Sequence, residues 1–275
     1  MDIRQSDNYA RYLENTGWVI ENINDVYYFI RKFTPLGSFI KIQRPKKIDL
    51  NAINKLVKKY RAFQVLIEPL ATTNYQLLTT NYGFRPASPY LPSKTLELDL
   101  KKSQIKLLEQ MRKNTRYGIK RAVTSLKANP DLALFRTSWK SAVGLKRYVP
   151  SSKNLAALKN AFGKNVLFLI DQNTNSGAIF LLSDKKAYYY QAFTDTKGRK
   201  NFAQYQIVWQ GILWAKKNKA RAFDFEGIYD ARFPNPKWLG FTHFKAGFGG
   251  SVITYPASLK KYYWKNLLIK KSREV

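Results

Sequence analysis

Side chains with strong nucleophilic or metal-binding chemistry are nearly absent from this 275-residue chain, which has no cysteine and one histidine, His243. The lack of cysteine excludes disulfides, cysteine-ligated zinc, iron–sulfur clusters and a thiol nucleophile. A single histidine excludes a metal centre built from several histidines and weakens any serine–histidine–aspartate arrangement. The sequence therefore predicts neither a metal nor a tightly bound cofactor.

Long apolar runs are also missing. The longest, at 166–170 and 178–182, are far shorter than the ~20 residues that a membrane-spanning helix needs. The N-terminal segment has no apolar core after a basic stretch, so it does not resemble a signal peptide. We therefore expect a cytoplasmic protein.

Acidic residues are few: 18 Asp and Glu stand against 48 Lys and Arg, a formal net charge of +30. Such an excess repels itself and favours a polyanionic partner, such as nucleic acid or an anionic membrane face. The plainer alternative is a lysine-rich, solvated surface with no specific partner. Hydrophobic residues make up 45% of the chain, which is enough to form folded cores and excludes a disordered chain.

The first half of the chain reads as an α/β unit. Two short apolar segments, 19–23 and 26–32, flank Asn24-Asp25 and predict a β-hairpin. Ser103 is placed to cap a helix that continues through Ala122. The other predicted elements are a strand at 39–42, a helix at 50–62, a strand at 64–68, a helix at 75–81, a proline-containing loop at 83–94 and a strand at 95–100.

The second half repeats this plan, and a basic amphipathic helix at 259–269 ends the chain. Its predicted elements are a helix at 152–162, strands at 166–170, 178–182 and 187–193, a helix at 202–218, a strand at 222–225, a helix at 242–246 and a strand at 252–255. The order of three meander strands, helix, strand, helix, strand predicts an α/β protein with two acetyltransferase-like domains in tandem. We assign 1–128 with 256–275 to the first domain and 129–255 to the second.

Familiar catalytic motifs are absent: the chain has no phosphate-binding P-loop, no dinucleotide-binding glycine pattern and no nucleophile elbow. The glycine-rich segment 247–250 leads into a strand, which favours a tight bend over a phosphate cradle. Asp224 and Glu226 can form a carboxylate pair at a strand edge, although surface or structural roles fit them better. His243 fits a packed or exposed residue better than a base.

Aromatic and basic residues remain as candidates. The tyrosines at 188–190 lie on one predicted strand, so alternate rings face opposite sides; we expect Tyr189 in the core. A ring that faces a cleft can stack on a base or sugar. A partly desolvated Lys245 is placed to neutralise an oxyanion or a phosphate. Its aromatic neighbours in the sequence are Phe241, Phe244 and Phe248.

Several segments of the chain resemble one protein family. The segment MRKNTRYGIKRA (111–122) resembles the signature helix of the Fem-type peptidyltransferases, the FemABX family. Other segments agree in order along nearly the whole chain: QSDNYARYLENTGW (5–18), PLGSFIKIQRP (35–45), IEP (67–69), GFRPASPYLPSKTLELDL (83–100), FDFEGIYD (223–230) and LGFTHFKAGFGG (239–250).

The resemblance implies an activity and a fold. Members of the family attach amino acids from aminoacyl-tRNA to peptidoglycan precursors, on two acetyltransferase-like domains whose C-terminal helix returns to the first. The coiled-coil insertion found in some members has no counterpart here, since no sustained heptads occur.

The resemblance also implies site residues. The family's lysine before the Gly-Phe turn corresponds to Lys245 and implies an electrostatic, catalytic role in transfer. Tyr190 matches a tyrosine that binds the diphosphate region of the precursor, and Arg11 matches a basic phosphate contact. A family pattern of Arg and Tyr four residues apart is absent, and Arg147 or Lys153 is expected to replace it in binding the acceptor.

Three basic residues on the signature helix, Arg116, Lys120 and Arg121, are expected either to contact tRNA phosphates or to support the cleft between the domains.

Our hypothesis is an aminoacyltransferase of cell-wall cross-bridge formation. Its expected partners are aminoacyl-tRNA, as co-substrate, and a nucleotide- or lipid-linked peptidoglycan precursor, with peripheral contact to the anionic inner membrane face. Two alternatives stay open. One is an acyl-CoA-dependent N-acyltransferase, for which the turn at 194–199 is a weak phosphate-binding candidate. The other is a non-catalytic tRNA-binding protein on the same scaffold.

Overall fold

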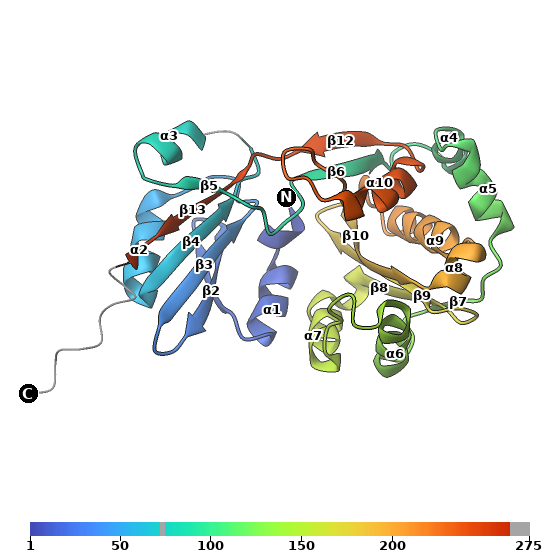
Figure 1. Cartoon of the computed structure of the whole chain (residues 1–275), viewed down its shortest axis with the longest axis horizontal. Helices are drawn as coiled ribbons and strands as arrows, with labels where there is room; N and C mark the ends of the chain where they lie inside the picture. The colour runs from blue at the N-terminus through green and yellow to red at the C-terminus, as the bar shows by residue number, and fades with distance from the viewer. Residues whose placement is uncertain (72–74, 265–275) are drawn as a thin grey trace, which may run out of the picture. The chain divides into compact units, whose positions relative to one another are not determined.

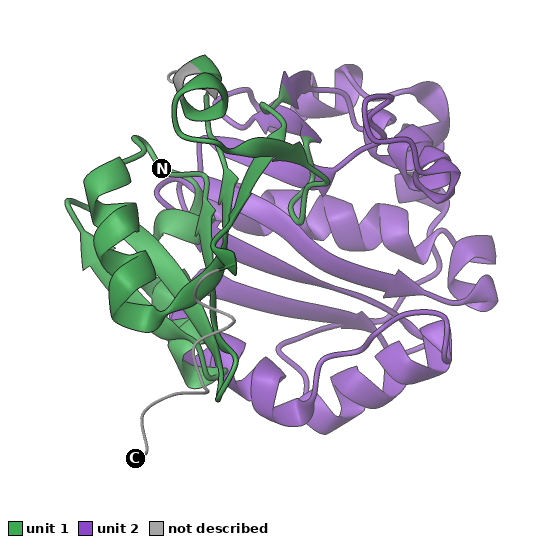
Figure 2. Cartoon of the chain, turned by 60° about the vertical axis from the view of Figure 1, so that its left-hand side comes forward, with its two compact units in different colours: residues 1–93, 254–275 green, residues 94–253 purple. Residues whose placement is uncertain are grey.

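The computed structural model describes residues 1–71 and 75–264 and divides the chain into two compact units (Figure 2). Unit 1 comprises residues 1–93 and the segment from residue 254 onward, and unit 2 comprises residues 94–253. Each unit is built around one mixed β-sheet with helices packed on it (Figure 1). The tandem α/β architecture predicted from the sequence is therefore observed.

The division between the units differs from the predicted one. We expected the first domain to continue to residue 128, whereas unit 1 ends at Ser93. The reason is the pairing of β6 (Lys94–Asp99), which runs antiparallel to β11 (Ala222–Gly227) and so belongs to the second sheet. The return of the chain to unit 1 at residue 254 lies within two residues of the expected position.

Unit 1 holds a sheet whose described strands follow the order β1-β2-β3-β4-β13-β5. Its strands β3 and β4 are parallel, because the helix α2 connects them, and the other described pairs are antiparallel. The elements of unit 1 are η1 (Ile3–Gln5), α1 (Asp7–Asn15), β1 (Val19–Ile23), β2 (Val26–Phe33), β3 (Gly37–Gln43), α2 (Leu50–Tyr60), β4 (Ala62–Glu68), α3 (Tyr75–Thr80), β5 (Arg85–Ala87) and β13 (Ser258–Tyr262).

The predicted hairpin is confirmed in β1 and β2. Asn24 and Asp25 both adopt positive φ angles, 53° and 60°, as a two-residue turn between twisted strands requires. The helix α2 is capped by Asp49, whose carboxylate accepts from the backbone N–H of Ala52 at 3.0 Å. Its buried face, including Ile53 and Leu56, packs in the core of unit 1.

Unit 2 holds a larger sheet, with the described strand order β12-β6-β11-β10-β9-β8-β7. Its remaining elements are α4 (Gln104–Glu109), α5 (Lys113–Arg121), β7 (Leu126–Ala128), α6 (Leu132–Val143), α7 (Ser152–Phe162), η2 (Gly163–Asn165), β8 (Val166–Asp171), β9 (Ser176–Ser183), β10 (Lys186–Thr194), α8 (Thr196–Lys200), α9 (Ala203–Lys217), η3 (Pro236–Trp238), α10 (Leu239–Ala246) and β12 (Ser251–Thr254).

Helices cover both faces of the second sheet (Figure 1). On one face, α9 packs on β8, β9 and β10 and buries a large apolar cluster. On the other face, Phe135 and Trp139 of α6 pack against Phe193 of β10, with ring centroids 5.2 and 5.4 Å apart. The sheet is thereby closed to solvent over most of its area.

Two neighbouring strands of this sheet, β10 and β11, separate partway along their length. They run parallel and pair from Lys186 and Ala222 to Tyr188 and Asp224. Both strands then continue beyond that point without further pairing to each other. The end of the ladder leaves backbone groups of β11 available for other partners.

The C-terminal helix predicted at 259–269 is wrong over the residues that can be compared. Ser258–Tyr262 form β13, which lies between β4 and β5, and Leu259 is fully buried beside Ile67. Backbone pairing with two strands overrides the helical spacing of its apolar residues. Residues 265–269 of the prediction lie outside the described residues.

The predicted helix from Ser103 to Ala122 is two helices. Ser103 caps α4 as expected, but Arg112 is extended, with φ −60° and ψ 149°. Its backbone N–H donates to the carbonyl oxygen of Gly247 at 2.8 Å, so a tertiary hydrogen bond interrupts the helical pattern. The short strands β5 and β7 and the helices α6 and α8 were not predicted.

Candidate functional site

Lys245 lies where β11 ends. It belongs to α10 and exposes only 9% of its surface, and its Nζ donates a hydrogen bond to the carbonyl oxygen of Gly227 at 2.6 Å. Burial lowers the pKa of Lys245 from 10.5 to about 8, while the nearby carboxyl groups of Glu226 and Asp224 oppose that change. The predicted desolvation of Lys245 is therefore confirmed.

Two aromatic rings flank this ammonium group. Its Nζ lies 5.1 Å from the ring centre of Phe241 and 5.8 Å from that of Tyr189, both within cation–π range. Phe244 and Phe248, which also neighbour Lys245 in the sequence, instead pack against Tyr205 in the core. Two rings and one carbonyl thus fix the position of the charge.

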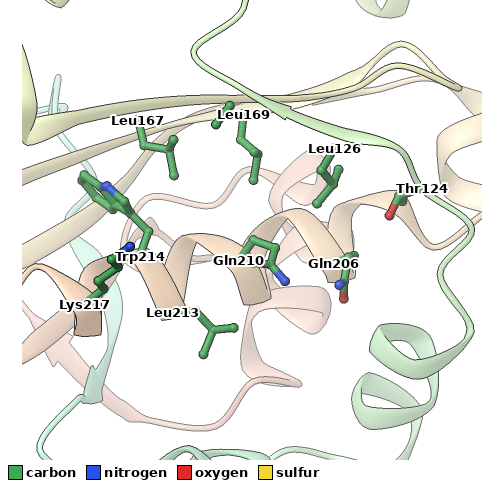
Figure 3. A pocket seen from close by; sticks show the side chains of 10 residues that line it. Thr124, Leu126, Leu167, Leu169, Gln206, Gln210, Leu213, Trp214 and Lys217 are labelled. Carbon is green, nitrogen blue, oxygen red and sulfur yellow. The ribbon is translucent and has the colours of Figure 1, made fainter.

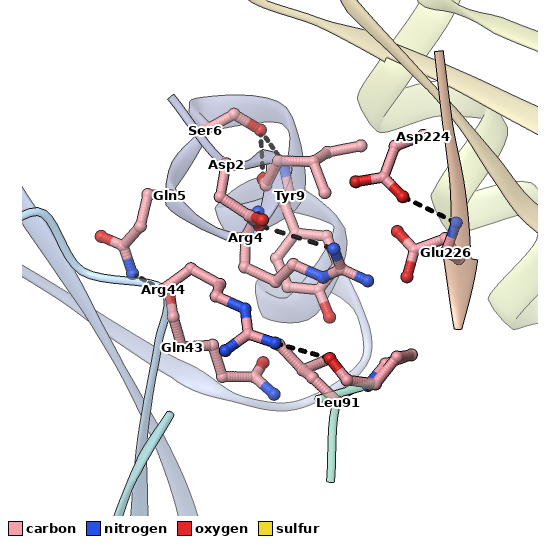
Figure 4. A network of polar contacts seen from close by, with 12 residues as sticks. Asp2, Arg4, Gln5, Ser6, Tyr9, Gln43, Arg44, Leu91, Asp224 and Glu226 are labelled. Carbon is pink, nitrogen blue, oxygen red and sulfur yellow. Dashed lines mark hydrogen bonds and ion pairs between the residues drawn. The ribbon is translucent and has the colours of Figure 1, made fainter. Parts of the chain in front are cut away.

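The carboxylate pair on β11 is part of the same site. Asp224 is buried, and its Oδ1 accepts from the backbone N–H of Glu226 at 2.7 Å (Figure 4). Thr95 on β6 contacts both Asp224 Oδ1 and the carbonyl oxygen of Glu226. Burial, followed by the charge of Glu226, raises the pKa of Asp224 well above its ordinary value. The structural role expected for Asp224 is confirmed.

Tyr189 is buried in the core, as predicted, and burial raises the pKa of its hydroxyl. Tyr190 is half-buried at an irregularity of β10, where the register with β9 shifts. Arg147 approaches the same strand: its guanidinium donates to the carbonyl oxygen of Ala192 and lies 5.6 Å from the ring centre of Trp139. Arg147 therefore contacts the strand that carries Tyr190, two positions further along the chain.

Two other expected acceptor-binding residues lie on exposed helical surfaces. Lys153 is exposed in the first turn of α7, in unit 2. Arg11 is exposed on α1, in unit 1. The sequence prediction that both bind the acceptor stays a prediction.

The basic residues of the signature helix lie on α5. Arg116 donates to the carbonyl oxygens of Met111 and of Glu109, the latter at 3.3 Å, so it stabilises the break between α4 and α5. Arg121 lies 6.0 Å from the ring centre of Tyr117, and Lys120 is exposed. All three are accessible to a polyanion, and Arg116 has a structural role as well.

The glycine-rich segment 247–250 forms a tight bend, as predicted. Gly249 and Gly250 have φ angles of 85° and 104°, in the left-handed region that favours glycine. Other side chains of the protein occupy the space beside Gly247 and Gly249. A Cβ on Gly247 would lie 2.2 Å from the hydroxyl of Thr115, and one on Gly249 would lie 3.1 Å from the side chain of Gln110.

The turn at 194–199 is occupied by its own carboxylate. Asp195 caps α8 and accepts from the backbone N–H of Gly198 at 2.6 Å and of Asn175 at 3.2 Å. In an acyl-CoA-binding turn such backbone N–H groups would bind the pyrophosphate. Here the carboxylate of Asp195 takes them and would repel a pyrophosphate by its negative charge. His243 is exposed, with Nδ1 3.4 Å from a guanidinium nitrogen of Arg112. Among the described residues there is no group of acidic and histidine side chains suited to a metal ion.

Unit 1 buries charged residues that the sequence did not single out. Arg4 pairs with Asp2 at 3.5 Å (Figure 4), and Arg44 donates to the carbonyl oxygens of Pro69 and Pro92. Glu68 accepts from the backbone N–H groups of Tyr90 and Leu91 and from Gln43. These groups anchor the loop after β5 to the sheet of unit 1.

An apolar groove of about 580 Å³ runs beside α9 (Figure 3). Its walls come from α9 and from β7 and β8, and none of the predicted site residues lines it. The lining residues are Thr124, Leu126, Ala128, Leu167, Leu169, Gln206, Gln210, Leu213, Trp214 and Lys217.

Comparison with solved structures defines the class of fold. A tandem GNAT protein from the clavulanic acid biosynthesis pathway aligns over 90% of this chain and 83% of its own, with a TM-score of 0.52 at 10% identity. A C-terminal domain from Agrobacterium fabrum, provisionally described as that of a lysylphosphatidylglycerol synthetase, aligns over 97% of this chain and 91% of its own, with a TM-score of 0.65 at 11% identity. The predicted fold of two acetyltransferase-like domains is confirmed.

The family resemblance is confirmed as well. Residues 151–271 match the model of the FemAB family. The crystal structure of FemX aligns over 97% of this chain and 93% of its own, with a TM-score of 0.78 at 13% identity. No curated protein matches the chain significantly. Of the described helices, none has the length and apolar character to cross a membrane.

Proposed function

We propose that this protein transfers an amino acid from aminoacyl-tRNA to an amine on a peptidoglycan precursor peptide. The observation that carries the proposal is the buried ammonium group of Lys245, held by the Gly227 carbonyl and two aromatic rings within the Fem-type motif FKAGFGG. A fixed positive charge of this kind suits a reaction that develops negative charge on an oxygen atom.

The reaction has such a step. The acceptor amine attacks the ester carbonyl of the aminoacyl-tRNA and forms a C–N bond, which places negative charge on the carbonyl oxygen. The C–O bond to the ribose then breaks, and the proton lost by the amine passes to the departing ribose oxygen. An activated ester requires mainly positioning and stabilisation of the oxyanion, so the reaction needs neither a cysteine nor a histidine nucleophile.

Charge supports the choice of donor. An excess of 30 positive charges favours a polyanion such as tRNA. Lys120 and Arg121, exposed on α5, are proposed to contact its phosphates, and Arg116 adds to the same surface. Because charged tRNA is found in the cytoplasm, we place the reaction there, on a soluble precursor or at the inner face of the membrane.

For the acceptor we propose Tyr190 and Arg147 on and beside β10, together with Lys153 of the same unit, and we keep Arg11 of unit 1 as a separate candidate for a phosphate contact. Their hydroxyl and cationic groups suit the diphosphate of a precursor. The comparisons support an aminoacyl rather than an acetyl donor, because FemX and a protein described as a lysylphosphatidylglycerol synthetase have TM-scores of 0.78 and 0.65. The carboxylate of Asp195 at the turn before α8 argues against binding of coenzyme A.

The test is incubation of the protein with a mixture of isotopically labelled aminoacyl-tRNAs and purified nucleotide- and lipid-linked precursors, read by mass spectrometry. We expect a precursor whose mass increases by one or more aminoacyl residues. Acyl transfer from acyl-CoA in a parallel reaction would support the N-acyltransferase alternative. Equal binding of charged and uncharged tRNA without transfer would support a binding protein.

A further inference from the structure

The end of β11 has an irregular backbone. The register between β11 and β6 shifts between Asp224 and Gly227, and Glu226 adopts a φ of 60°, in the left-handed region. A side chain larger than glycine rarely takes this conformation and keeps it only where its surroundings determine it. Some neighbouring group must therefore hold residues 224–227 in place.

Two buried polar side chains do so. Asp224 Oδ1 accepts from the backbone N–H of Glu226 at 2.7 Å, which closes a tight turn within the strand. The hydroxyl of Thr95 contacts both that carboxyl oxygen and the carbonyl oxygen of Glu226. Thr95 and Asp224 are 2% and 3% exposed, so water competes little for these hydrogen bonds.

The residue after this turn, Gly227, carries the carbonyl that binds Lys245: its oxygen accepts from Lys245 Nζ at 2.6 Å. The N–H of the same peptide group, that of Ile228, donates to the carbonyl oxygen of Lys94 at 3.0 Å, so the turn holds this peptide group on one side and the pairing with β6 holds it on the other. The rings of Tyr189 and Phe241 also lie near the ammonium group, at 5.8 and 5.1 Å from ring centre to Nζ. A contact with a ring face attracts the charge but directs the N–H bonds less strictly than a hydrogen bond to a carbonyl oxygen. The hydrogen-bonded orientation of Lys245 thus depends on the backbone that Thr95 and Asp224 fix.

We propose that Thr95 and Asp224 are positioning residues for aminoacyl transfer: they hold the Gly227 carbonyl on the Lys245 ammonium group, and so set the direction of its charge. The inference rests on the proposed function, because the proposed function is what gives Lys245 a role in transfer. Thr95 and Asp224 act through Lys245 and not on the substrate.

Several other ionisable groups surround Asp224 and Lys245. Their charges also affect the pKa of Lys245, so the variants tested leave these groups unchanged. Glu226 lies on the same strand as Asp224 and interacts with both groups. They also include Lys186 on β10, which pairs with Glu97 of β6, Tyr189 on β10, and Arg147 beside Tyr189.

The test is the variant Thr95→Val, which keeps the shape of the side chain but removes its hydroxyl. Labelling of each lysine with isotopic acetic anhydride at a series of pH values, read by mass spectrometry, reports the titration of Lys245 without any substrate. Loss of the hydroxyl removes a hydrogen bond from the anion of Asp224 and releases the carbonyl that stabilises the charged Lys245. Both effects disfavour the ammonium form, so we expect the midpoint for Lys245 to fall below about 8, by roughly one pH unit.

Transfer provides the second readout. We expect the single-turnover rate at pH 7 to fall about tenfold or more in Thr95→Val, because a misdirected charge stabilises the oxyanion less. Thr95→Ser restores the hydroxyl and should restore both the midpoint and the rate. Lys140, exposed on α6, serves as the reference lysine for labelling.

A matched control separates positioning from stability. Thr174 is also buried, and its hydroxyl donates to Asp171 at 2.6 Å in the same unit. Thr174→Val should lower the stability of the fold in the same way but leave the Lys245 midpoint unchanged. If Thr95→Val does not fold, Thr95→Ala carries the test, since it also removes the hydroxyl and leaves the charge of Asp224 in place.

The outcomes are distinct. An unchanged Lys245 midpoint in folded Thr95→Val, or in Thr95→Ala, would overturn the positioning role even if transfer is observed. A lowered midpoint in a protein that shows no transfer would leave the geometric relationship standing and count against the proposed function instead. An equal change in Thr174→Val would assign the effect to general destabilisation and overturn the inference.

Discussion

The carbonyl oxygen of Gly227 and the Nζ atom of Lys245 lie 2.6 Å apart and join the end of β11 to α10 through a buried hydrogen bond. The two residues are 18 positions apart in the sequence, and the acceptor of this hydrogen bond is a neutral carbonyl oxygen. A buried ammonium held by a neutral carbonyl keeps its charge available to act on a bound group.

The pH dependence of transfer is expected to follow Lys245. If the ammonium form stabilises the oxyanion, the single-turnover rate should decline as the pH rises through about 8, rather than near the ordinary value of 10.5. Rates measured between pH 6.5 and 9.5 on donor and acceptor at saturation give this midpoint. A rate that stays constant or rises across that interval would contradict a role for the charged form.

Lys245 should also cost stability. Its pKa is lowered in the folded state, so the unfolded chain binds the proton more tightly and the fold is penalised wherever Lys245 is charged. At pH 7 we expect Lys245→Met to raise the free energy of unfolding by about 1 to 3 kcal/mol, after loss of the Gly227 hydrogen bond offsets part of the gain. This difference should shrink as the pH rises from about 8 towards 10.5. Urea unfolding at pH 7 and pH 10 measures it, and a less stable variant at pH 7 would show that Lys245 is structural.

Binding of tRNA should depend steeply on salt. Each phosphate contact contributes about 0.7 to 0.9 to the slope of log K against log salt concentration. Lys120→Ala should weaken binding and reduce the slope by about one contact, since Lys120 is exposed on α5. Lys164→Ala, in the exposed η2 turn of the same unit, is the control and should leave the slope unchanged if tRNA follows α5. An affinity for tRNA that does not depend on salt would contradict the proposal that the basic surface binds tRNA phosphates.

Glu68 should be required for the stability of unit 1. Its carboxylate accepts from two backbone N–H groups, those of Tyr90 and Leu91, and from Gln43, while exposing 1% of its surface. Glu68→Ala leaves these buried donors without an acceptor and should lower the free energy of unfolding by about 3 kcal/mol. Glu14→Ala, on the exposed side of α1, should change it by less than about 0.5 kcal/mol in the same denaturant titration.

Local patterns were enough to predict much of the fold. The positions of Asn24 and Asp25 predicted the hairpin, and the cap at Ser103 predicted the start of α4, because turns and caps depend on neighbouring residues. The same reasoning did not predict the domain of β6 or the strand β13, because their places in the sheets depend on pairing with the distant strands β11 and β4. No periodicity in residues 94–99 or 258–262 encodes those partners.

The candidate site was predicted in part. Lys245 was selected from its aromatic neighbours and from the motif, and its burial is observed. Thr95 was overlooked, because a threonine on an alternating strand carries no signal until Asp224 is placed beside it. The packing of Thr115 against Gly247 was not predicted, because nothing in the sequence places these two residues together.

The most direct measurement of the central claim compares single-turnover transfer by the wild-type protein and by Lys245→Met, with the affinity for the acceptor measured separately. Lys237→Met, exposed in η3, is the matched control. The account predicts that Lys245→Met remains folded and binds the acceptor, but transfers about 10² to 10³ times more slowly, while Lys237→Met keeps the wild-type rate. A decrease of less than about threefold in folded Lys245→Met, against that expected range, would remove Lys245 from the mechanism.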